Sequence, residues 1–386
     1  MASRYDAVYQ HSITDPEAFW SQQAERIHWD RPFDSVLDRG NPPFTSWFKG
    51  GLTNLCYNAV DRHLAERGDQ PALVWESTEV DRTQIFTYSE LHAEVNRVAA
   101  IFKHLGIAHG DRVLIYMPMI PEAVFAMLAC ARIGATHSVV FGGFAAGSLA
   151  KRIDDAKPRL IVSADAGMRG GRVIPYKPLL DAALAEARAA SPQVLLVNRG
   201  LTEDLPWNDG RDLDYATLAQ QFENVHIPVE WVDSAHPSYV LYTSGTTGLP
   251  KGIQRDTGGH AVALATSMEL VYGTRPGETM LTTSDIGWVV GHSYIVYGPL
   301  LSGVTTILYE GLPIRPDAGI WWRLVEKYGV QTMFSSPTAF RVLRKQGEAP
   351  IRSADTASLR NLFLAGEPLD ESTHRWAIET LQTEVI

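Results

Sequence analysis

The chain has little cysteine and no long apolar run. Its 386 residues include only Cys56 and Cys130. A disulfide framework is therefore not expected, both thiols fit small buried side chains, and this usage suits a reducing cytoplasm. No apolar run approaches the roughly 20 residues of a membrane helix, because AVFAMLACA ends at Arg132.

Positive charge is also scarce. Lys and Arg number 34 against 44 Asp and Glu, which gives a net charge of −10. With no basic run, a dedicated nucleic-acid or membrane-surface partner is not expected. The polar N-terminal stretch does not resemble a signal peptide. The 12 histidines show no metal-ligand spacing, so no metal site built by protein side chains is expected.

What the sequence does have is a regular alternation of strand and helix patterns. Thr87 and Glu90 form a capping box ahead of an apolar helix face that Gly106 ends. A buried strand covers 113–117, Pro121 suits the first turn of a helix that runs to about Ile133, and another strand follows. This unit predicts a parallel sheet.

The alternation continues to the end of the chain after a polar connection at 200–236. The sequence predicts an α/β fold of two open, mostly parallel sheets flanked by helices, divided into 1–225 and 226–386. A strand at 238–243 is expected to open the second sheet, followed by a loop and then a helix. Further strands are expected at 279–283, 305–310, 330–335, 361–365 and 383–386.

The loop after 238–243 reads YTSGTTGLPKG, from Tyr242 to Gly252. Glycines allow close backbone approach, hydroxyls donate hydrogen bonds, and one lysine supplies a point charge, so the loop suits a polyphosphate. It is not a Walker A loop, because Pro250 precedes Lys251 and Gly252 follows it. The predicted phosphate contacts are Thr243, Ser244, Gly245, Thr246, Thr247, Gly248 and Lys251.

This stretch resembles the phosphate-binding signature of the adenylate-forming superfamily, in particular the AMP-forming acyl-CoA synthetases. The similarity runs from about Tyr5 to the end and is greatest to the short-chain branch. It implies that Mg²⁺-bound ATP and a short-chain carboxylate form acyl-AMP and pyrophosphate, and that coenzyme A then displaces AMP. By the same resemblance, LAGEP adds nucleotide contacts at Gly366, Glu367 and Pro368, although Glu367 could instead cap the following helix.

Two further stretches resemble the coenzyme A contacts of that branch. They are SVVFGGF and MRGGR. The implied contacts are Phe141, Gly142, Gly143, Arg169, Gly170, Gly171 and Arg172. Two guanidinium groups three residues apart suit phosphates. The alternatives are an ordinary strand-to-helix turn and a solvated basic turn.

The segment TSDIGWVVGHSYIVYGPL resembles the acyl pocket of the family, which implies Trp288, Val289, Val290 and Ala365 as its wall. Ala365 and Val290 stand where acetate-specific members usually have valine and threonine. The smaller, drier wall implies propionate as the preferred acid, with acetate as the alternative and butyrate also open. Ordinary core packing is the other explanation, and His260 and His292 are expected to be structural.

The resemblance places the Mg²⁺-binding glutamate, the adenylation lysine and a mobile C-terminal lid domain beyond Ile386. Gln382, Thr383 and Glu384 mimic part of the glutamate motif but lie too close to LAGEP, so they are not assigned to it. The 386 residues alone are therefore expected to form little acyl-CoA. A non-catalytic nucleotide- or coenzyme A-binding protein without that domain is the alternative of another class.

Overall fold

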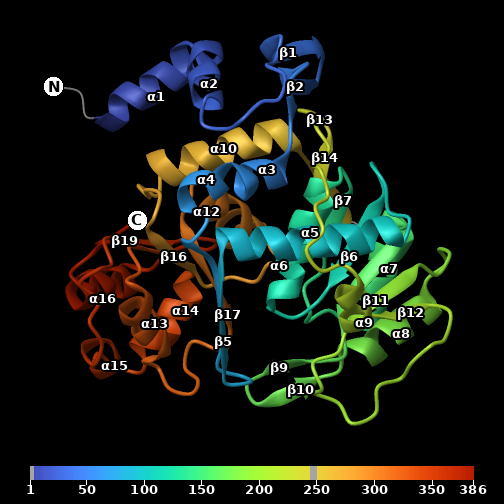
Figure 1. The fold of residues 1–386 in the computed structure, drawn as a ribbon. Helices are drawn as coiled ribbons and strands as arrows, with labels where there is room; N and C mark the ends of the chain where they lie inside the picture. Colours follow the sequence, from blue (N-terminus) through green and yellow to red (C-terminus); the bar gives the residue numbers. More distant parts are fainter. Residues whose placement is uncertain (1–3, 244–249) are drawn as a thin grey trace.

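The computed structural model describes residues 4–243 and 250–386. Two seven-stranded sheets form its framework, and within each sheet every neighbouring pair is parallel except the last pair at one edge. Helices flank both sheets (Figure 1). The predicted α/β fold of two open, mostly parallel sheets is confirmed.

The two sheets are defined by their strand orders. The first runs β12 (Asp212–Asp214), β11 (Gln193–Val197), β8 (Leu160–Ala164), β6 (Arg112–Tyr116), β7 (Thr136–Val139), β14 (Pro237–Thr243) and β15 (Lys251–Asp256). The second runs β20 (Glu384–Val385), β19 (Asn361–Leu364), β18 (Thr332–Ser335), β16 (Thr279–Thr282), β17 (Thr305–Glu310), β4 (Pro71–Ser77) and β5 (Arg82–Thr87).

Strand membership corrects one sequence-based expectation. The strand at 238–243 does not open the second sheet, because β14 pairs with β7 of the first sheet, with Tyr239 opposite His137. The phosphate loop is also followed by β15 before any helix; this edge strand is polar and exposed, so it carries no apolar pattern. Alternation along a chain does not reveal which sheet a strand joins. The division at residue 225 stays a prediction.

The helices begin and end where local signals place them. The capping box at Thr87 and Glu90 starts α5 (Tyr88–His104), and Pro121 is the first residue of α6 (Pro121–Arg132). Among the described helices, none is both long and apolar enough to cross a membrane. The other helices that flank the sheets or the core are α3 (Leu55–Ala59), α7 (Ala146–Ala156), α8 (Tyr176–Glu186), α9 (Tyr215–Gln221), α10 (Thr257–Leu270), α12 (Gly298–Leu301), α13 (Ile320–Tyr328), α14 (Pro337–Arg344) and α16 (Glu371–Leu381).

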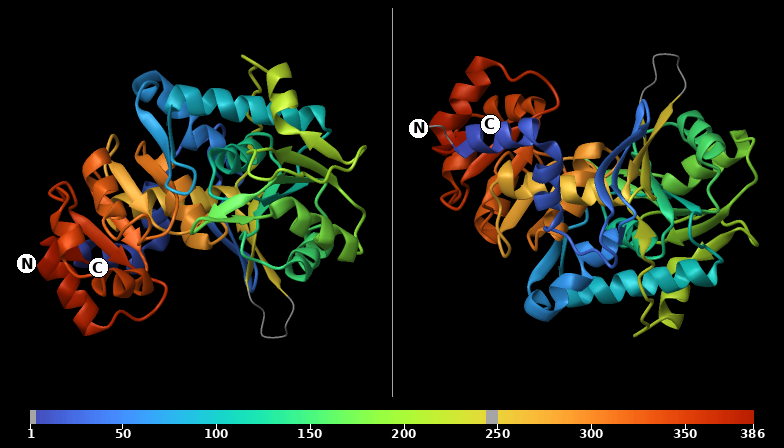
Figure 2. Two further views of the ribbon diagram at one scale, coloured as in Figure 1. Left: turned by 90° about the horizontal axis from the view of Figure 1, so that it is seen from below. Right: turned by 90° about the horizontal axis from the view of Figure 1, so that it is seen from above.

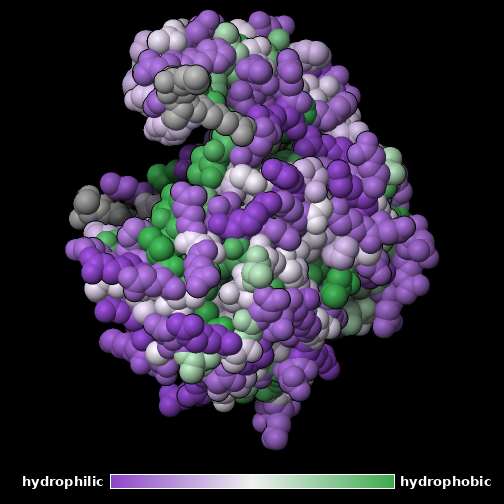
Figure 3. Space-filling model, turned by 90° about the vertical axis from the view of Figure 1, so that its left-hand side faces the viewer, coloured by the Kyte–Doolittle hydropathy of each residue, from purple (hydrophilic) through white to green (hydrophobic). Residues whose placement is uncertain are grey.

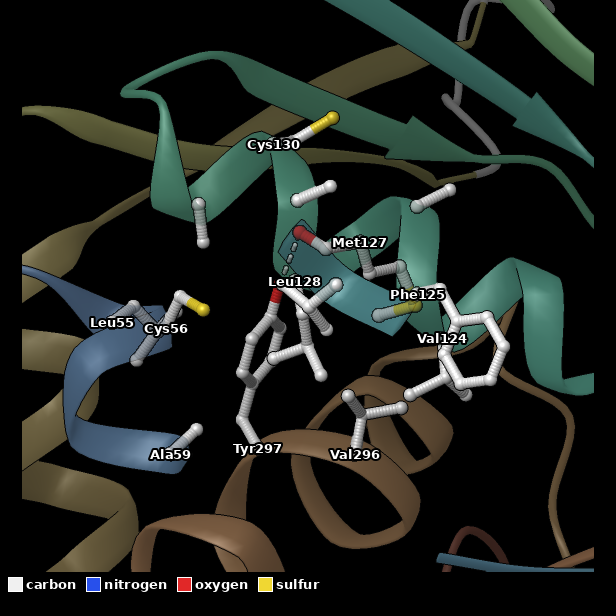
Figure 4. Packing of buried hydrophobic residues seen from close by; sticks show 14 of the residues in the cluster. Leu55, Cys56, Ala59, Val124, Phe125, Met127, Leu128, Cys130, Val296 and Tyr297 are labelled. Atoms are coloured by element: carbon white, nitrogen blue, oxygen red, sulfur yellow. Dashed lines mark hydrogen bonds between the residues drawn. The ribbon is translucent and has the colours of Figure 1, made fainter. Parts of the chain in front are cut away.

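The largest core surrounds α6, in which every residue except Glu122 is buried. Side chains of α6 pack against α3 and against a π-helical turn, His292–Tyr297, whose Tyr297 hydroxyl donates to the Met127 carbonyl at 3.5 Å (Figure 4). Cys56 and Cys130 are buried here as free thiols, as the sequence predicts. Burial raises the pKa of Cys56 to about 12, so that thiol stays protonated.

The carboxyl edges of the two sheets face each other. Arg199 follows β11 of the first sheet, and its guanidinium donates two hydrogen bonds of 2.8 Å to Glu310, the last residue of β17 in the second sheet. Figure 2 shows the two halves of the molecule on either side of this junction. Open α/β sheets bind ligands at the carboxyl ends of their strands, so the junction is the expected site.

Candidate active site

The predicted phosphate loop lies between two paired strands. Thr243, the last residue of β14, is directly opposite Lys251, the first residue of β15, and both side chains are exposed. The antiparallel pairing therefore holds the two ends of the loop together. The other predicted contacts, Ser244, Gly245, Thr246, Thr247 and Gly248, lie outside the described residues.

Tyr242 anchors the strand that leads into this loop. Its hydroxyl donates a hydrogen bond of 2.6 Å to Asp155 near the end of α7. Burial, the hydrogen bond to Asp155 and that carboxylate's charge all raise the pKa of Tyr242, so the hydroxyl remains a donor at neutral pH. The loop's first aromatic residue is thus fixed to a helix of the same sheet.

Arg152 joins this strand to the aromatic turn. Arg152 is buried, with only 6% of the residue exposed. Its guanidinium lies 4.2 Å from the centre of the Phe144 ring and 5.7 Å from the centre of the Tyr242 ring. Within the described part of the chain it forms no ion pair and donates to the Ser148 carbonyl at 2.7 Å. Stacking on aromatic faces is how this buried charge is accommodated.

The turn predicted to contact coenzyme A adjoins the predicted acyl segment. The ring of Phe141 lies 5.3 Å from Trp288, and Phe144 lies 6.2 Å from the same indole. A Cβ on Gly142 would come within 1.7 Å of the Tyr176 hydroxyl, so only glycine fits there. Phe141, Gly142 and Gly143 are therefore brought together with Trp288 across the junction of the two sheets.

The arginine turn is a tight hairpin between β9 (Gly167–Arg169) and β10 (Arg172–Ile174). Gly170 and Gly171 both have positive φ, +62° and +74°. Their amides donate to the carboxylate of Glu79 at 2.6 and 2.9 Å. These two amides are thus already occupied, whereas Arg169 and Arg172 are exposed.

A partly buried carboxylate lies between these features. Burial raises the pKa of Asp285 to about 6, opposed by the Gly287 amide and by the positive charge of Arg169. The Gly287 amide donates to Asp285 at 2.7 Å, and Gly287 packs against the Phe141 backbone. At neutral pH Asp285 is mostly ionised, so this part of the junction combines a partly buried negative charge with exposed arginines.

The acyl wall residues differ in exposure. Trp288 is 47% and Val289 48% exposed, whereas Val290 packs against a small apolar cluster that includes Phe334 and Phe363. Ala365 is exposed directly after β19, and its amide donates to the Ser335 carbonyl at 3.2 Å. All four lie after the carboxyl ends of second-sheet strands. The face in Figure 3 is mostly polar, with apolar side chains gathered in a hollow.

The predicted nucleotide turn at Gly366, Glu367 and Pro368 is exposed, and Gly366 has φ +104°. Glu367 does not cap the following helix: Asp370 caps α16, accepting from the Thr373 amide at 2.9 Å. Glu367 instead accepts from the Thr338 amide at 2.7 Å, and hydrogen bonds from the Thr338 side chain and amide lower its pKa. Parallel pairing of β18 and β19 places this turn beside the start of α14, so Glu367 binds that helix and not α16.

The histidines singled out from the sequence are core residues. His292 and His260 are 0% and 9% exposed, and both lie against Tyr239. Gln382 ends α16, and Thr383 donates to the Leu359 carbonyl at 2.8 Å. Within the described residues, no group of three or more His, Cys, Asp or Glu side chains could hold a metal ion.

Several residues at the junction were missed by sequence reasoning. Glu79, Arg152 and Asp155 are ordinary charged residues in polar stretches, and no local pattern separates them from solvated ones. Their partners are distant in sequence: 91 residues separate Glu79 from Gly170, and 87 separate Asp155 from Tyr242. Only the paired sheets bring them together.

Comparison with known proteins agrees with this architecture. Residues 60–386 match the family model described as AMP-binding enzyme, and residues 5–59 match that of the acetyl-coenzyme A synthetase N-terminus. The chain is 59% identical over 382 residues to a propionate--CoA ligase of Salmonella typhimurium, and 57% identical to the one of Escherichia coli. It is 43% identical over 379 residues to an acetyl-coenzyme A synthetase of Xanthobacter autotrophicus.

The two ligase alignments cover 99% of this chain and 61% of each relative, and the synthetase alignment covers 97% and 58%. The chain therefore spans about three-fifths of the length of these relatives. The AMP-binding model alone accounts for most of the chain, including both sheets from β4 onward. The chain belongs to the AMP-binding enzyme family.

Proposed function

We propose that the protein activates a short-chain carboxylate with Mg²⁺-bound ATP and transfers the acyl group to coenzyme A. One observation carries the proposal: the Phe141 ring lies 5.3 Å from Trp288. Transfer to coenzyme A requires its thiol to reach the activated acyl carbon. The predicted coenzyme A turn and the predicted acyl wall must therefore adjoin, and these two residues do.

The proposed reaction has two displacements. A carboxylate oxygen attacks the α-phosphorus of ATP while the bond to pyrophosphate breaks, which gives acyl-AMP. The thiolate sulfur of coenzyme A then attacks the acyl carbon, and AMP leaves. The first step depends on positioning and charge neutralisation. Lys251 would contribute to that neutralisation. Mg²⁺ would be bound to ATP on arrival, and we assign no protein ligand to the metal ion.

Propionate is the proposed acid. The chain shares 59% and 57% identity with relatives named propionate--CoA ligase. Ala365 at the wall leaves room that a larger side chain would fill, and one buried methylene contributes about 0.8 kcal/mol. Acetate is the second candidate, since an acetyl-coenzyme A synthetase is 43% identical.

The proposed partners are small molecules only: the carboxylate, ATP and coenzyme A. We further propose a cytoplasmic location. Two buried free thiols fit a reducing compartment, and that is where ATP and coenzyme A are supplied.

The test uses a polypeptide of the relatives' full length that contains these 386 residues. It is incubated with Mg²⁺, ATP, coenzyme A and either propionate, acetate or butyrate, and AMP and acyl-CoA are measured by chromatography. Stoichiometric AMP and propionyl-CoA support the proposal. Nucleotide and coenzyme A binding without either product would support the binding-protein alternative, and ADP in place of AMP would exclude an adenylate-forming reaction.

A further inference from the structure

The hairpin β9–β10 that carries Arg169 and Arg172 is a separate two-stranded sheet. A lone two-stranded hairpin is only marginally stable in water. Its tip must therefore be held by other parts of the molecule if the two arginines are to have a fixed position. The contacts at Gly170 and Gly171 show what holds it.

The first contact comes from Glu79, in the turn between β4 and β5 of the second sheet. Successive backbone amides in a turn can form an anion-binding concavity. Here the anion is the Glu79 carboxylate, which accepts from both glycine amides, at 2.6 and 2.9 Å. Figure 1 shows the hairpin at the lower end of the molecule beside the chain that connects β4 to β5.

The second contact comes from Arg315, which follows β17 in the same sheet. Its guanidinium donates to the Gly170 carbonyl at 2.5 Å. Two oppositely charged side chains that follow strands of the second sheet therefore bind the tip. Glu79 accepts from its amides and Arg315 donates to its carbonyl. A Cβ on Gly170 would also lie 3.3 Å from Leu312, so the fit is close.

The arginines beside this tip are left available. Within the described residues neither Arg169 nor Arg172 forms an ion pair or a side-chain hydrogen bond, and both are exposed. The charge of Arg169 acts on the partly buried Asp285 of the acyl segment, where it offsets part of the rise in pKa that burial causes. The hairpin thus presents two exposed guanidinium groups at the junction of the sheets, while Glu79 and Arg315 hold the backbone of its tip in place.

We propose that Glu79 is a positioning residue for coenzyme A: its carboxylate fixes the Arg169–Arg172 turn against the second sheet so that both guanidinium groups meet the ligand's phosphates. This inference rests on the proposed function. Glu79 itself does not touch the ligand. It acts by holding two charges at a set distance from the acyl segment, which an untethered hairpin would not do.

The test compares E79Q with D81N in a polypeptide of the relatives' full length. Asp81 lies in the same turn and is exposed, and among the described residues it forms no hydrogen bond or ion pair with the hairpin. D81N therefore removes a negative charge from the turn and keeps the bonds between Glu79 and the glycine amides. Two quantities are measured for each variant: amide hydrogen exchange in the peptide covering 167–174, without ligand, and the KM values for coenzyme A and for ATP.

We expect E79Q to speed exchange at the tip about tenfold and to raise KM for coenzyme A about tenfold, as for the loss of a charge-assisted hydrogen bond. KM for ATP and kcat should change less than about twofold, and D81N should match the parent in all measurements. Unchanged tip exchange or an unchanged KM for coenzyme A in E79Q would overturn the proposal. A lower KM for coenzyme A would also overturn it, because Glu79 would then be a competitor of the phosphates.

The two proposals fail in different ways. If the parent protein forms neither AMP nor acyl-CoA, the proposed function fails, and coenzyme A affinity is then measured directly by calorimetry in the parent and E79Q. Coenzyme A that binds the parent no more tightly than E79Q overturns the positioning role in that case as well. If the parent is active but E79Q has the parent's tip exchange and the parent's KM for coenzyme A, the proposed function is retained and the positioning role of Glu79 is rejected.

Discussion

The Tyr242 hydroxyl donates a hydrogen bond of 2.6 Å to Asp155, which joins the strand before the phosphate loop to α7. The contact ties the loop's entry to the same helix that carries Arg152. An aromatic residue at this place is thus an anchor for backbone position as well as part of a motif.

Removing this anchor should weaken nucleotide binding. Y242F deletes the donor and keeps the ring, and the loss of one such bond costs about 1 kcal/mol, or roughly fivefold in affinity. We expect KM for ATP to rise by that factor with kcat little changed. D155N should have a smaller effect in the same direction, because its amide oxygen still accepts. Y5F, on an exposed N-terminal tyrosine, is the control, and equal KM values in all three variants would contradict the anchoring role.

The Arg199–Glu310 pair should matter for stability. Both side chains are nearly buried, 9% and 4% exposed, and they join the two sheets. E310Q leaves the guanidinium without its charged partner, and breaking a buried pair costs about 3–5 kcal/mol. Urea unfolding should show that loss. The matched control is E371Q, which breaks the exposed Glu371–Arg375 pair and should leave the midpoint almost unchanged. A similar midpoint for both variants would mean that the junction does not depend on this pair.

Buried histidines should make the protein sensitive to acid. Burial lowers the pKa of His292 to about 4 and that of His260 to about 3, from ordinary values near 6.5. Below pH 6.5 the unfolded chain binds protons that the folded chain does not, so the free energy of unfolding falls as pH drops toward 4. Urea unfolding of H292Q between pH 7 and 4 should show a shallower slope, by at most about 1.4 kcal/mol per pH unit. A slope equal to that of the parent would contradict this assignment.

Ala365 should set the acid preference. A365V adds bulk to the proposed wall, and one methylene-sized change in a pocket discriminates by about 10–200-fold. We expect the ratio of kcat/KM for propionate to kcat/KM for acetate to be about 10–200-fold lower in A365V than in the parent. A357V makes the same change at another exposed alanine and should leave the ratio unaltered. If A365V also left it unaltered, Ala365 would not line the pocket.

Local features of this fold could be predicted because their signals are local. The capping box at Thr87 and the proline that begins α6 each lie within one helical turn of what they control. The alternation of strands and helices likewise predicted two parallel sheets. Membership of β14 could not be predicted in this way, since it depends on pairing with β7, about 100 residues earlier.

In the candidate site too, residues with a local sequence signal could be predicted and residues defined by long-range contacts could not. Motif residues such as Phe141 and Trp288 were predicted from resemblance, and the structure adds that their rings lie 5.3 Å apart. The residues that hold motifs in place, Glu79 and Asp155, have no sequence signal. Each is a carboxylate in a polar stretch whose partner comes from a distant part of the chain, and only the fold defines that partner.

The proposed activation of a short-chain carboxylate is tested most directly by measuring whether AMP formation depends on the carboxylate. A polypeptide of the relatives' full length is incubated with Mg²⁺, ATP and coenzyme A, with propionate, with acetate or with neither. We expect one AMP and one pyrophosphate for each acyl-CoA formed, with the higher kcat/KM for propionate. AMP formation that does not depend on the acid, or no AMP with either acid, would contradict the proposed activation.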